Sequence, residues 1–378
     1  MADVTQATPM IGDPSGDAAG GLRRIGGRLG RSGAQGSGRL FVFLKESGIL
    51  IALILLIIAG SLMSPHFLTA SNFANVFREV ALAGILGIGM TFVILTAGID
   101  LSVGSILGFS GVAGAIFLSQ GLPWPVGVIL GLLAGAFVGA LNGLGVTKGK
   151  LPPFIMTLGM LVIARGVTMT YTEGQPIPLR PHEQAFAWVW TGAFLRIPVP
   201  VWIMLLTGAV AAFTLRYTSF GRHVYAVGDN IEAARLSGIN TDRVLFNVYV
   251  ISGLCSAITG LILVSKVRTG LPKSGEGWEL IAIAIVVIGG TSLFGGEGSI
   301  RGTMIGAAIV GIVNNLLNLI GVSSFSQNIV RGAIILGAVL VAGQSITRRQ
   351  TERGDKKVID APELVASDDA PETVSRGE

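Results

Sequence analysis

The sequence predicts an all-α, polytopic membrane protein with broken helices and glycine-rich turns. Of its 378 residues, 51% are hydrophobic and only 13% are charged, which is too apolar for a soluble domain of this length. The 55 glycines favour close helix packing and sharp breaks. Apolar runs of roughly 17 to 25 residues, long enough to cross a bilayer, predict about ten transmembrane helices. They lie near 48–64, 80–97, 102–119, 124–146, 152–170, 198–215, 245–266, 279–293, 302–320 and 327–343.

The distribution of basic residues predicts how the chain is oriented. If the N-terminus lies in the cytoplasm, most of the 27 Lys and Arg residues also fall on that side, as the positive-inside rule requires. Both termini are therefore expected in the cytoplasm. We expect a disordered tail over 1–44, a transmembrane domain over 45–345 and a second disordered tail over 346–378. The first tail lacks the apolar region of a signal peptide, so the first hydrophobic run is expected to remain as an anchor.

Several kinds of site are excluded by the residue types present. The single cysteine, Cys255, lies in an apolar span, where we expect it to act as a buried small hydrophobe. The three histidines, His66, His182 and His223, are far apart, and no Cys, His and carboxylate group has metal-ligand spacing. We therefore expect no metal and no cofactor. The net charge of +5 does not indicate a nucleic-acid partner, because the basic residues form no single face or motif.

The second predicted span ends in a polar break over residues 96–105, after which apolar residues resume at once. A carboxylate near the apolar zone costs up to roughly 2.5–3.5 kcal/mol, so Asp100 should be satisfied by partners. In one interpretation Asp100 or Ser102 caps the third helix, at a sharp turn that Gly98 and Gly104 permit. In the other, the broken helix lines an aqueous path and offers these polar groups to a solute.

Three amides lie in other predicted spans. Asn142 sits beside a stripe of glycines in the fourth span, which is therefore expected to pack closely at the centre. The stripe consists of Gly131, Gly135, Gly139 and Gly143. Asn314 and Asn318, four residues apart in the ninth span, place two amides on one helix face. All three amides either join helices by hydrogen bonds or line a translocation path.

The longest internal stretch that carries charge throughout is 215–244. Asp229 is expected to cap a helix of about two turns there, with Glu232 reaching back to the helix start. Gly238 is expected to end the helix in the left-handed conformation. With Arg235 beside Glu232, this helix forms a small mixed knob suited to a groove on another protein. The alternative is an ordinary surface turn between two membrane helices.

The glycine-rich run at 289–302 does not predict phosphate binding. It follows no predicted strand and does not end in Gly-Lys-Ser or Gly-Lys-Thr. We interpret it as a tight turn at the cytoplasmic membrane face. Its order of apolar run, glycine, acidic residue, serine and apolar run echoes the break at 96–105, as a weak internal repeat.

Three of these stretches resemble the marker sequences of the ribose, xylose and arabinose type of monosaccharide ABC importer permease. They are GIDLSVGS at 98–105, FGRHVYAVGDNIEAARLSGIN at 220–240 and GGTSLFGGEGSIRG at 289–302. In the second stretch, Glu232-Ala233-Ala234 followed by Gly238 resembles the cytoplasmic motif that couples such permeases to their ATPase. The isoleucine-x-leucine-proline tail seen in many of these permeases is absent here.

The resemblance implies a ten-helix permease subunit in the bacterial inner membrane that forms the path for a monosaccharide or a related small polar solute. It implies a cytoplasmic ATP-binding-cassette ATPase, a periplasmic solute-binding protein and a second permease copy in a homodimer. ATP hydrolysis is expected on the separate ATPase, so this chain is not expected to be an enzyme. The residues that the resemblance assigns to ATPase coupling, within the loop 215–244, are Asp229, Glu232, Ala233, Ala234, Arg235 and Gly238.

Two other classes of protein fit part of the pattern. A secondary transporter driven by an ion gradient would use Asp100 as its ion site, but Asp100 is nearly alone and a capped internal loop has no role there. A membrane-embedded enzyme would need a catalytic group that no His, Cys or paired carboxylate supplies. The solute stays open among ribose, xylose, arabinose, galactose, a polyol and related compounds.

Overall fold

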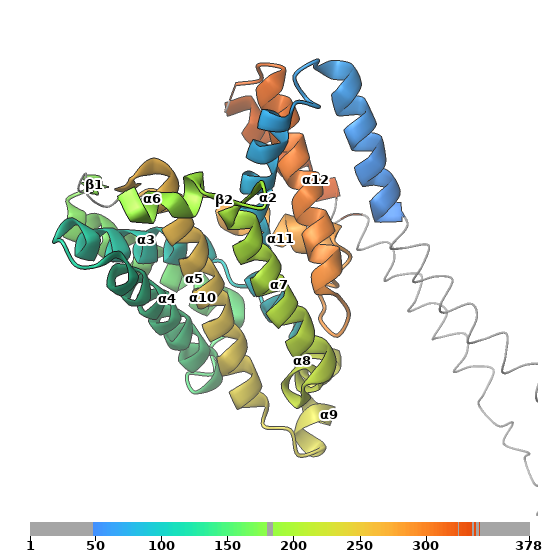
Figure 1. Cartoon of the computed structure of the whole chain (residues 1–378). Coiled ribbons are helices and arrows are strands. Elements are labelled where there is room, and N and C mark those ends of the chain that lie inside the picture. Colours follow the sequence, from blue (N-terminus) through green and yellow to red (C-terminus); the bar gives the residue numbers. More distant parts are fainter. Residues whose placement is uncertain (1–47, 180–183, 324, 335, 338–339, 341–378) are drawn as a thin grey trace, which may run out of the picture. The chain divides into compact units, whose positions relative to one another are not determined.

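The computed structural model describes residues 48–179, 184–323, 325–334, 336–337 and 340. Both predicted tails, 1–44 and 346–378, lie outside the described residues. The chain divides into two units, Met1–Val322 and Ser323–Glu378. In the second unit, residues 325–334 are helical. All elements named below belong to the first unit (Figure 1).

The described part of the first unit is predominantly helical. Its helices are Gly48–Met63, α2 (Ala70–Leu95), α3 (Val103–Ser119), α4 (Trp124–Thr147), α5 (Pro153–Thr172), α6 (Gln184–Thr191), α7 (Val199–Tyr217), α8 (Ser219–Asp229), α9 (Ile231–Leu236), α10 (Thr241–Val267), α11 (Trp278–Ile288) and α12 (Ile300–Leu319). Short strands pair in two small antiparallel sheets, β1 (Ile177–Pro178) with β4 (Thr269–Gly270) and β2 (Ala193–Phe194) with β3 (Ile197–Pro198).

Among the described residues, six helices are long and apolar enough to cross a membrane, namely α2, α4, α5, α7, α10 and α12. Three more are apolar but shorter: Gly48–Met63, α3 and α11. The prediction of a helical protein with several membrane spans is therefore confirmed. The number of ten spans and the cytoplasmic termini stay predictions.

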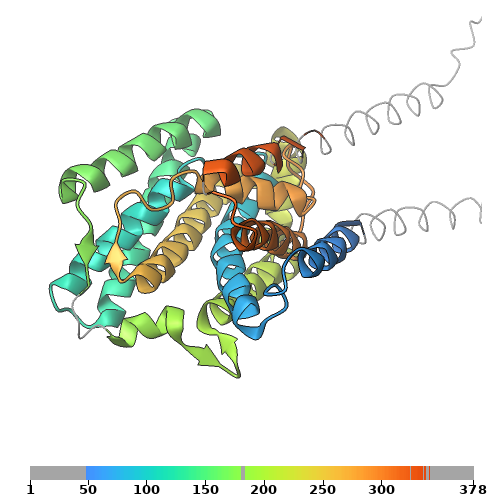
Figure 2. The same cartoon turned by 90° about the horizontal axis from the view of Figure 1, so that it is seen from above.

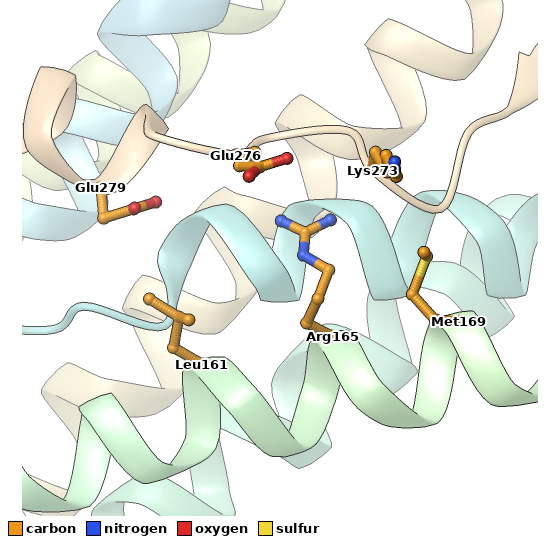
Figure 3. Close-up of a pocket in the computed structure, with 6 residues that line it drawn as sticks. All are labelled: Leu161, Arg165, Met169, Lys273, Glu276 and Glu279. Atoms are coloured by element: carbon orange, nitrogen blue, oxygen red, sulfur yellow. The ribbon is translucent and has the colours of Figure 1, made fainter. Parts of the chain in front are cut away.

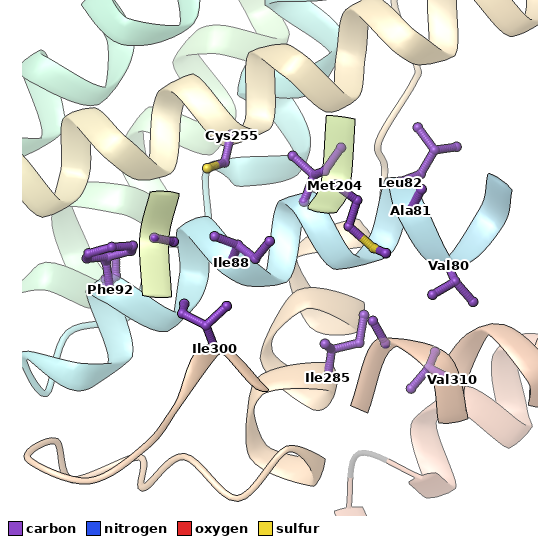
Figure 4. Packing of buried hydrophobic residues seen from close by; sticks show 14 of the residues in the cluster. Val80, Ala81, Leu82, Ile88, Phe92, Met204, Cys255, Ile285, Ile300 and Val310 are labelled. Carbon is purple, nitrogen blue, oxygen red and sulfur yellow. The ribbon is translucent and has the colours of Figure 1, made fainter. Parts of the chain in front are cut away.

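The centre of this unit is formed by α2 and α10. Within an apolar stretch of 18 residues in each helix, 83% of the α2 stretch and 72% of the α10 stretch are buried inside the protein, whereas only 22% of the α5 stretch is buried. α10 lies between α2 on one side and α3 and α4 on the other (Figure 2). Figure 4 shows Ile88 and Phe92 along α2, with Met204, Cys255 and Ile285 of three other helices in the same apolar cluster. As predicted, Cys255 is buried. A helix that is apolar on all sides lies either in a protein core or against lipid, and α2 and α10 are of the first kind.

The glycine stripe of α4 faces α10, as its spacing predicts. A Cβ atom on Gly135 would lie 2.6 Å from the Cβ of Ala257, and one on Gly143 would lie 2.9 Å from the ring of Phe246. Both distances are shorter than real side chains allow. Glycine therefore sets how closely these two helices approach.

The break between α2 and α3 reverses the chain over residues 96–102. The prediction was that Gly98 and Gly104 permit this turn, and its left-handed residue is Ala97, with φ of 60°. Gly98 is needed for space instead, because a Cβ there would lie 2.8 Å from Oη of Tyr249. The sharp turn thus depends on Ala97, while the glycine next to it admits the buried tyrosine.

The predicted eighth span, 279–293, is helical only as far as Ile288. α11 has 11 residues and is followed by a turn over residues 289–299 that leads into α12. The chain before α11, residues 271–277, contains turns and no helix. This explains why the apolar run at this position is short.

Candidate functional site

The charged stretch 215–244 folds at its centre as two short helices, α8 and α9, and α9 lies at the opposite end of α10 from α6 (Figure 1). The prediction that Asp229 caps α9 is wrong. The cap is Asn230, whose Oδ1 accepts the backbone N–H of Ala233 at 2.9 Å. Asp229 is the last residue of α8, because the N–H of Asn230 still bonds to the carbonyl of Ala226. Asp and Asn cap helices equally well, so spacing did not separate them.

The surface of α9 is charged on one side. Glu232 pairs with Arg235 at 3.1 Å, and does not reach back to the helix start as predicted. This exposed pair adds little stability but fixes where the two charges lie. Ala233 is exposed, whereas Ala234 is buried and therefore does not belong to the outer surface of the predicted knob. Leu236, which is 89% exposed, is the main apolar group that α9 presents.

The end of α9 follows the prediction. Gly238 has a φ of 82°, in the left-handed region. Its N–H bonds to the carbonyl of Arg235, and the N–H of Ile239 bonds to the carbonyl of Ala234. These two bonds close the helix with a left-handed glycine. No atom lies within 4 Å of a Cβ built on Gly238, so the requirement for glycine is conformational and not steric.

The stretches selected from the sequence meet at the base of α9. The N–H of Gly296 donates to the carbonyl of Leu95 at 3.0 Å. A Cβ on Gly228 would overlap that same carbonyl and would lie 2.6 Å from the nitrogen of Gly296. Tyr225 adds a bond from its hydroxyl to the carbonyl of Gly298 at 2.9 Å. The end of α2, the end of α8 and the glycine-rich turn are thus held together, and we call Leu95, Gly228 and Gly296 the backbone junction.

Asp100 is fully buried in the break that follows this junction. Its Oδ1 accepts the backbone N–H and the hydroxyl of Ser102, at 3.0 and 2.6 Å. Its Oδ2 accepts the hydroxyl of Ser252 on α10 at 2.8 Å. Ser102 is the N-cap of α3, but its side chain makes no capping bond. Asp100 therefore fixes the cap residue and ties it to α10, which corrects the prediction that either residue caps α3 directly.

Asn142 joins the same network. Its Nδ2 donates to the hydroxyl of Ser102 at 2.7 Å, and the residue is fully buried. Its Oδ1 and the hydroxyl of Tyr249 are buried and have no hydrogen-bond partner among the described residues. Asp100 and Ser102 were predicted from one stretch and Asn142 from another, and the structure brings all three together between α3, α4 and α10.

Comparison with known proteins identifies the family. A family model described as branched-chain amino acid transport system / permease component matches residues 72–339. The chain belongs to this permease family. This permease is 46% identical over 300 residues to the ribose import permease protein of Haemophilus influenzae, covering 79% of this chain and 93% of that protein. Over 298 residues it is 46% identical to the ribose import permease protein of Bacillus subtilis, covering 79% and 92%.

A more distant relative is the L-arabinose ABC transporter permease protein of Azospirillum brasilense. It is 36% identical to this permease over 307 residues, which are 81% of this chain and 90% of that protein. No solved structure matches the chain. The resemblance to monosaccharide ABC importer permeases is therefore confirmed.

The other predicted amides lie on α12 of the permease. Asn314 is half-buried and Asn318 is exposed, whereas Asn142 is fully buried. Sequence reasoning missed their neighbour Asn315, which exchanges two amide hydrogen bonds with Asn72, at 2.8 and 3.0 Å. The pair fastens the start of α2 to α12. No sequence pattern predicts it, because the partners are 243 residues apart.

Arg165 of α5 was also missed. Its side chain, in the second half of α5, turns into the permease and is half-buried. Its Nη1 donates to the carbonyls of Pro272 and Ser274 at 2.6 and 2.8 Å. The reason is that the non-helical chain before α11 has carbonyl groups without helical partners, and these need donors within the membrane.

Proposed function

We propose that this chain is the permease subunit of an ABC importer and forms the transmembrane path for a monosaccharide. The observation that carries the proposal is the 46% identity to ribose import permeases over more than nine-tenths of their length. The names of the relatives favour a pentose as the solute. The chain itself is not an enzyme, since ATP hydrolysis belongs to a separate subunit in this class of transporter.

The proposed complex has an ATP-binding-cassette ATPase below α9, a periplasmic solute-binding protein on the opposite side and a second copy of this permease. In this arrangement the chain crosses the bacterial inner membrane about ten times over residues 45–345 and leaves both tails in the cytoplasm. α9 is the coupling helix, presenting Glu232, Ala233 and Arg235 to the ATPase. The left-handed end at Gly238 and the backbone junction support this role, because they make α9 a rigid protrusion.

We assign Asp100, Ser102 and Asn142 to the helix break that the coupling motion reaches first, and Asn314 and Asn318 to the wall of the path. The support for the first assignment is the hydrogen-bond network that joins α3, α4 and α10. The support for the second is the position of two amides four residues apart on an apolar span, where polar side chains are costly and mark solute paths.

ATP-driven uptake of sugar is the direct test. The permease is reconstituted in proteoliposomes with its ATPase and its solute-binding protein, and radiolabelled D-ribose and L-arabinose are supplied outside. We expect uptake that requires ATP inside the vesicle and the binding protein outside. Absence of uptake for every monosaccharide tried, in a complex that hydrolyses ATP, would overturn the proposed function.

The same vesicles distinguish the ion-driven alternative. Asp100 accepts three hydrogen bonds from serine groups, which makes it a structural residue and a poor site for an ion that must come and go. We therefore expect uptake to persist when a protonophore collapses the ion gradient at constant ATP. Loss of uptake under that condition would favour a secondary transporter that uses Asp100.

A further inference from the structure

A charged recess lies beside the chain that precedes α11 (Figure 3). Its volume is about 280 Å³, and its lining residues are Leu161, Arg165, Met169, Lys273, Glu276 and Glu279. The first three are spaced by four residues along α5 and therefore share one face of that helix. The other three come from the non-helical chain and the first turn of α11. The recess thus lies beside α5, one of the helices long and apolar enough to cross a membrane.

The segment 269–277 follows α3 for a considerable distance. A Cβ on Gly270 would lie 3.2 Å from Cα of Val112, and a Cβ on Gly104 would overlap the carbonyl of Gly275. These two points are eight residues apart on α3, which is about 12 Å along its axis. That is a large part of the roughly 30 Å of the apolar layer. Irregular backbone at such a depth is tolerated only where protein covers it or where it borders a water-filled path.

The charges in the recess face one another without contact. Among the described residues, no ion pair joins Arg165 or Lys273 to Glu276 or Glu279. Figure 3 shows the guanidinium of Arg165 pointing from α5 toward the segment that carries Lys273 and Glu276, with Glu279 on the start of α11 beside it. Lys273 and Glu276 are exposed, and Glu279 is half-buried. The two positive and two negative groups therefore enclose a space instead of neutralising one another by contact.

Arg165 also keeps donors for a ligand. A guanidinium has five N–H groups. Nη1 donates to the carbonyls of Pro272 and Ser274, and Nη2 donates to the carbonyl of Gly104 at 3.4 Å. Two N–H groups are therefore left without a partner among the described residues. The arginine is held in place by the backbone and still has capacity to bind.

We infer that this recess binds a neutral, polyhydroxylated solute of monosaccharide size during its passage, an inference that rests on the proposed function. Hydroxyl groups need donors and acceptors together, and Arg165 with the two carboxylates supplies both. The balanced charge disfavours an anion and a cation alike. Leu161 and Met169 offer apolar contacts to the C–H face of a ring. The volume lies at the lower limit of ligand pockets, roughly 300–1,000 Å³, as a small solute requires.

The test measures discrimination between two sugars and not overall activity. Proteoliposomes take up either D-ribose or 2-deoxy-D-ribose, each at saturating concentration of the loaded binding protein, so that the ratio of the two maximal rates reports the permease. The variants are Glu279→Gln, which keeps the size of the side chain, and Glu276→Ala, an exposed position whose change spares the fold. Glu173→Gln, an exposed carboxylate at the end of α5 outside the recess, is the matched control.

We expect the ratio to fall at least about fivefold in both recess variants, because a site that bonds a hydroxyl discriminates against the sugar that lacks it. The ratio should not change in Glu173→Gln. An unchanged ratio in Glu279→Gln and Glu276→Ala, with both complexes assembled, would overturn the inference and leave the proposed function intact. An equal loss of both uptake rates would also overturn it, because that is the signature of a structural role. Wild-type vesicles that take up no ribose would count against the proposed function itself.

Discussion

Asp100 is a buried carboxylate whose described partners are serine groups and no cation. Each bond to a charged acceptor contributes about 1.5–3 kcal/mol, and each donor left open inside the protein costs about 1–3 kcal/mol. The side chain therefore stabilises the break between α2 and α3 mainly by satisfying donors. The negative charge is secondary to this role, so a neutral side chain that still accepts hydrogen bonds should replace Asp100 better than an apolar one.

Asp100→Asn should be tolerated better than Asp100→Leu. The amide keeps one oxygen for Ser102, and the serine hydroxyls can rotate to accept from its NH₂ group. Leucine removes every acceptor and leaves three donors open, so we expect it to lower the free energy of unfolding by at least about 3 kcal/mol. The measurements are the melting temperature of the purified permease and uptake per assembled complex. Equal loss in the two variants would mean that the charge matters more than the hydrogen bonds.

At the residue scale, the sequence predicts which side chains are unusual but not what they contact. An acidic residue between two apolar runs already indicates that Asp100 has partners. Its bond to Ser252 lies outside any local pattern, because that residue is 152 positions away. Likewise, the glycines suggested the turn, but Ala97 takes the left-handed conformation. Gly98 is required for another reason, because a side chain there would collide with Tyr249.

At the scale of elements, α9 is a six-residue helix whose stability depends on its two ends. Asn230 accepts a free backbone N–H at the start of the helix, and Gly238 ends the helix in the left-handed conformation. The charges of Glu232 and Arg235 are therefore presented in a fixed arrangement. A subunit powered by a separate ATPase must receive free energy through contacts that differ between two states. A rigid protrusion transmits such a difference better than a flexible loop.

Gly238→Val and Arg235→Glu should uncouple the transporter without blocking membrane insertion. A β-branched residue is strained at a φ of 82°, and reversing Arg235 places a like charge beside Glu232. Gly238→Asn, which tolerates this conformation, is the control for the first variant, and Arg243→Glu on α10 is the control for the second. The measurement is sugar-stimulated ATP hydrolysis by the reconstituted complex. Wild-type stimulation in both test variants would mean that α9 is a plain connector.

Gly228→Ala should weaken the backbone junction. A methyl group there overlaps the carbonyl of Leu95, so the end of α8 must separate from α2 or α9 must shift. We expect assembly to persist while the stimulation of ATP hydrolysis by sugar falls several-fold. Gly159→Ala, at a helical position with no neighbour within 4 Å of its Cβ, is the matched control. Equal stimulation in both variants would remove the junction from the coupling route.

Element types were easier to predict than element boundaries. The long apolar runs identified α2, α4, α5, α7, α10 and α12 because length and hydropathy agree there. The cap of α9 was misplaced by one residue, since Asp229 and Asn230 have the same capping chemistry and only the length of α8 decides between them. α11 was extended too far because the glycines after Ile288 continue the apolar composition without continuing the helix.

At the scale of the whole molecule, positions far apart in sequence meet in two places. Leu95, Gly228 and Gly296 form the backbone junction, while Asp100, Asn142 and Ser252 form the network beside it. Three ordered motifs in the sequence selected Asp100, Gly228 and Gly296 but not their partners Leu95, Asn142 and Ser252. Their convergence could not be predicted, because it depends on how α2, α8 and the turn before α12 pack together.

The three neighbouring asparagines of α12 allow its predicted role in the path to be tested within one helix. Asn315 is committed to Asn72, so Asn315→Leu should lower the melting temperature by leaving the amide oxygen of the buried Asn72 open, at a cost of about 1–3 kcal/mol, with little effect on sugar preference. The double variant Asn314→Leu, Asn318→Leu should instead change the affinity or selectivity of uptake in an assembled complex. Unchanged transport kinetics in a stable double variant would remove both residues from the path and leave α5 as the better candidate for its wall.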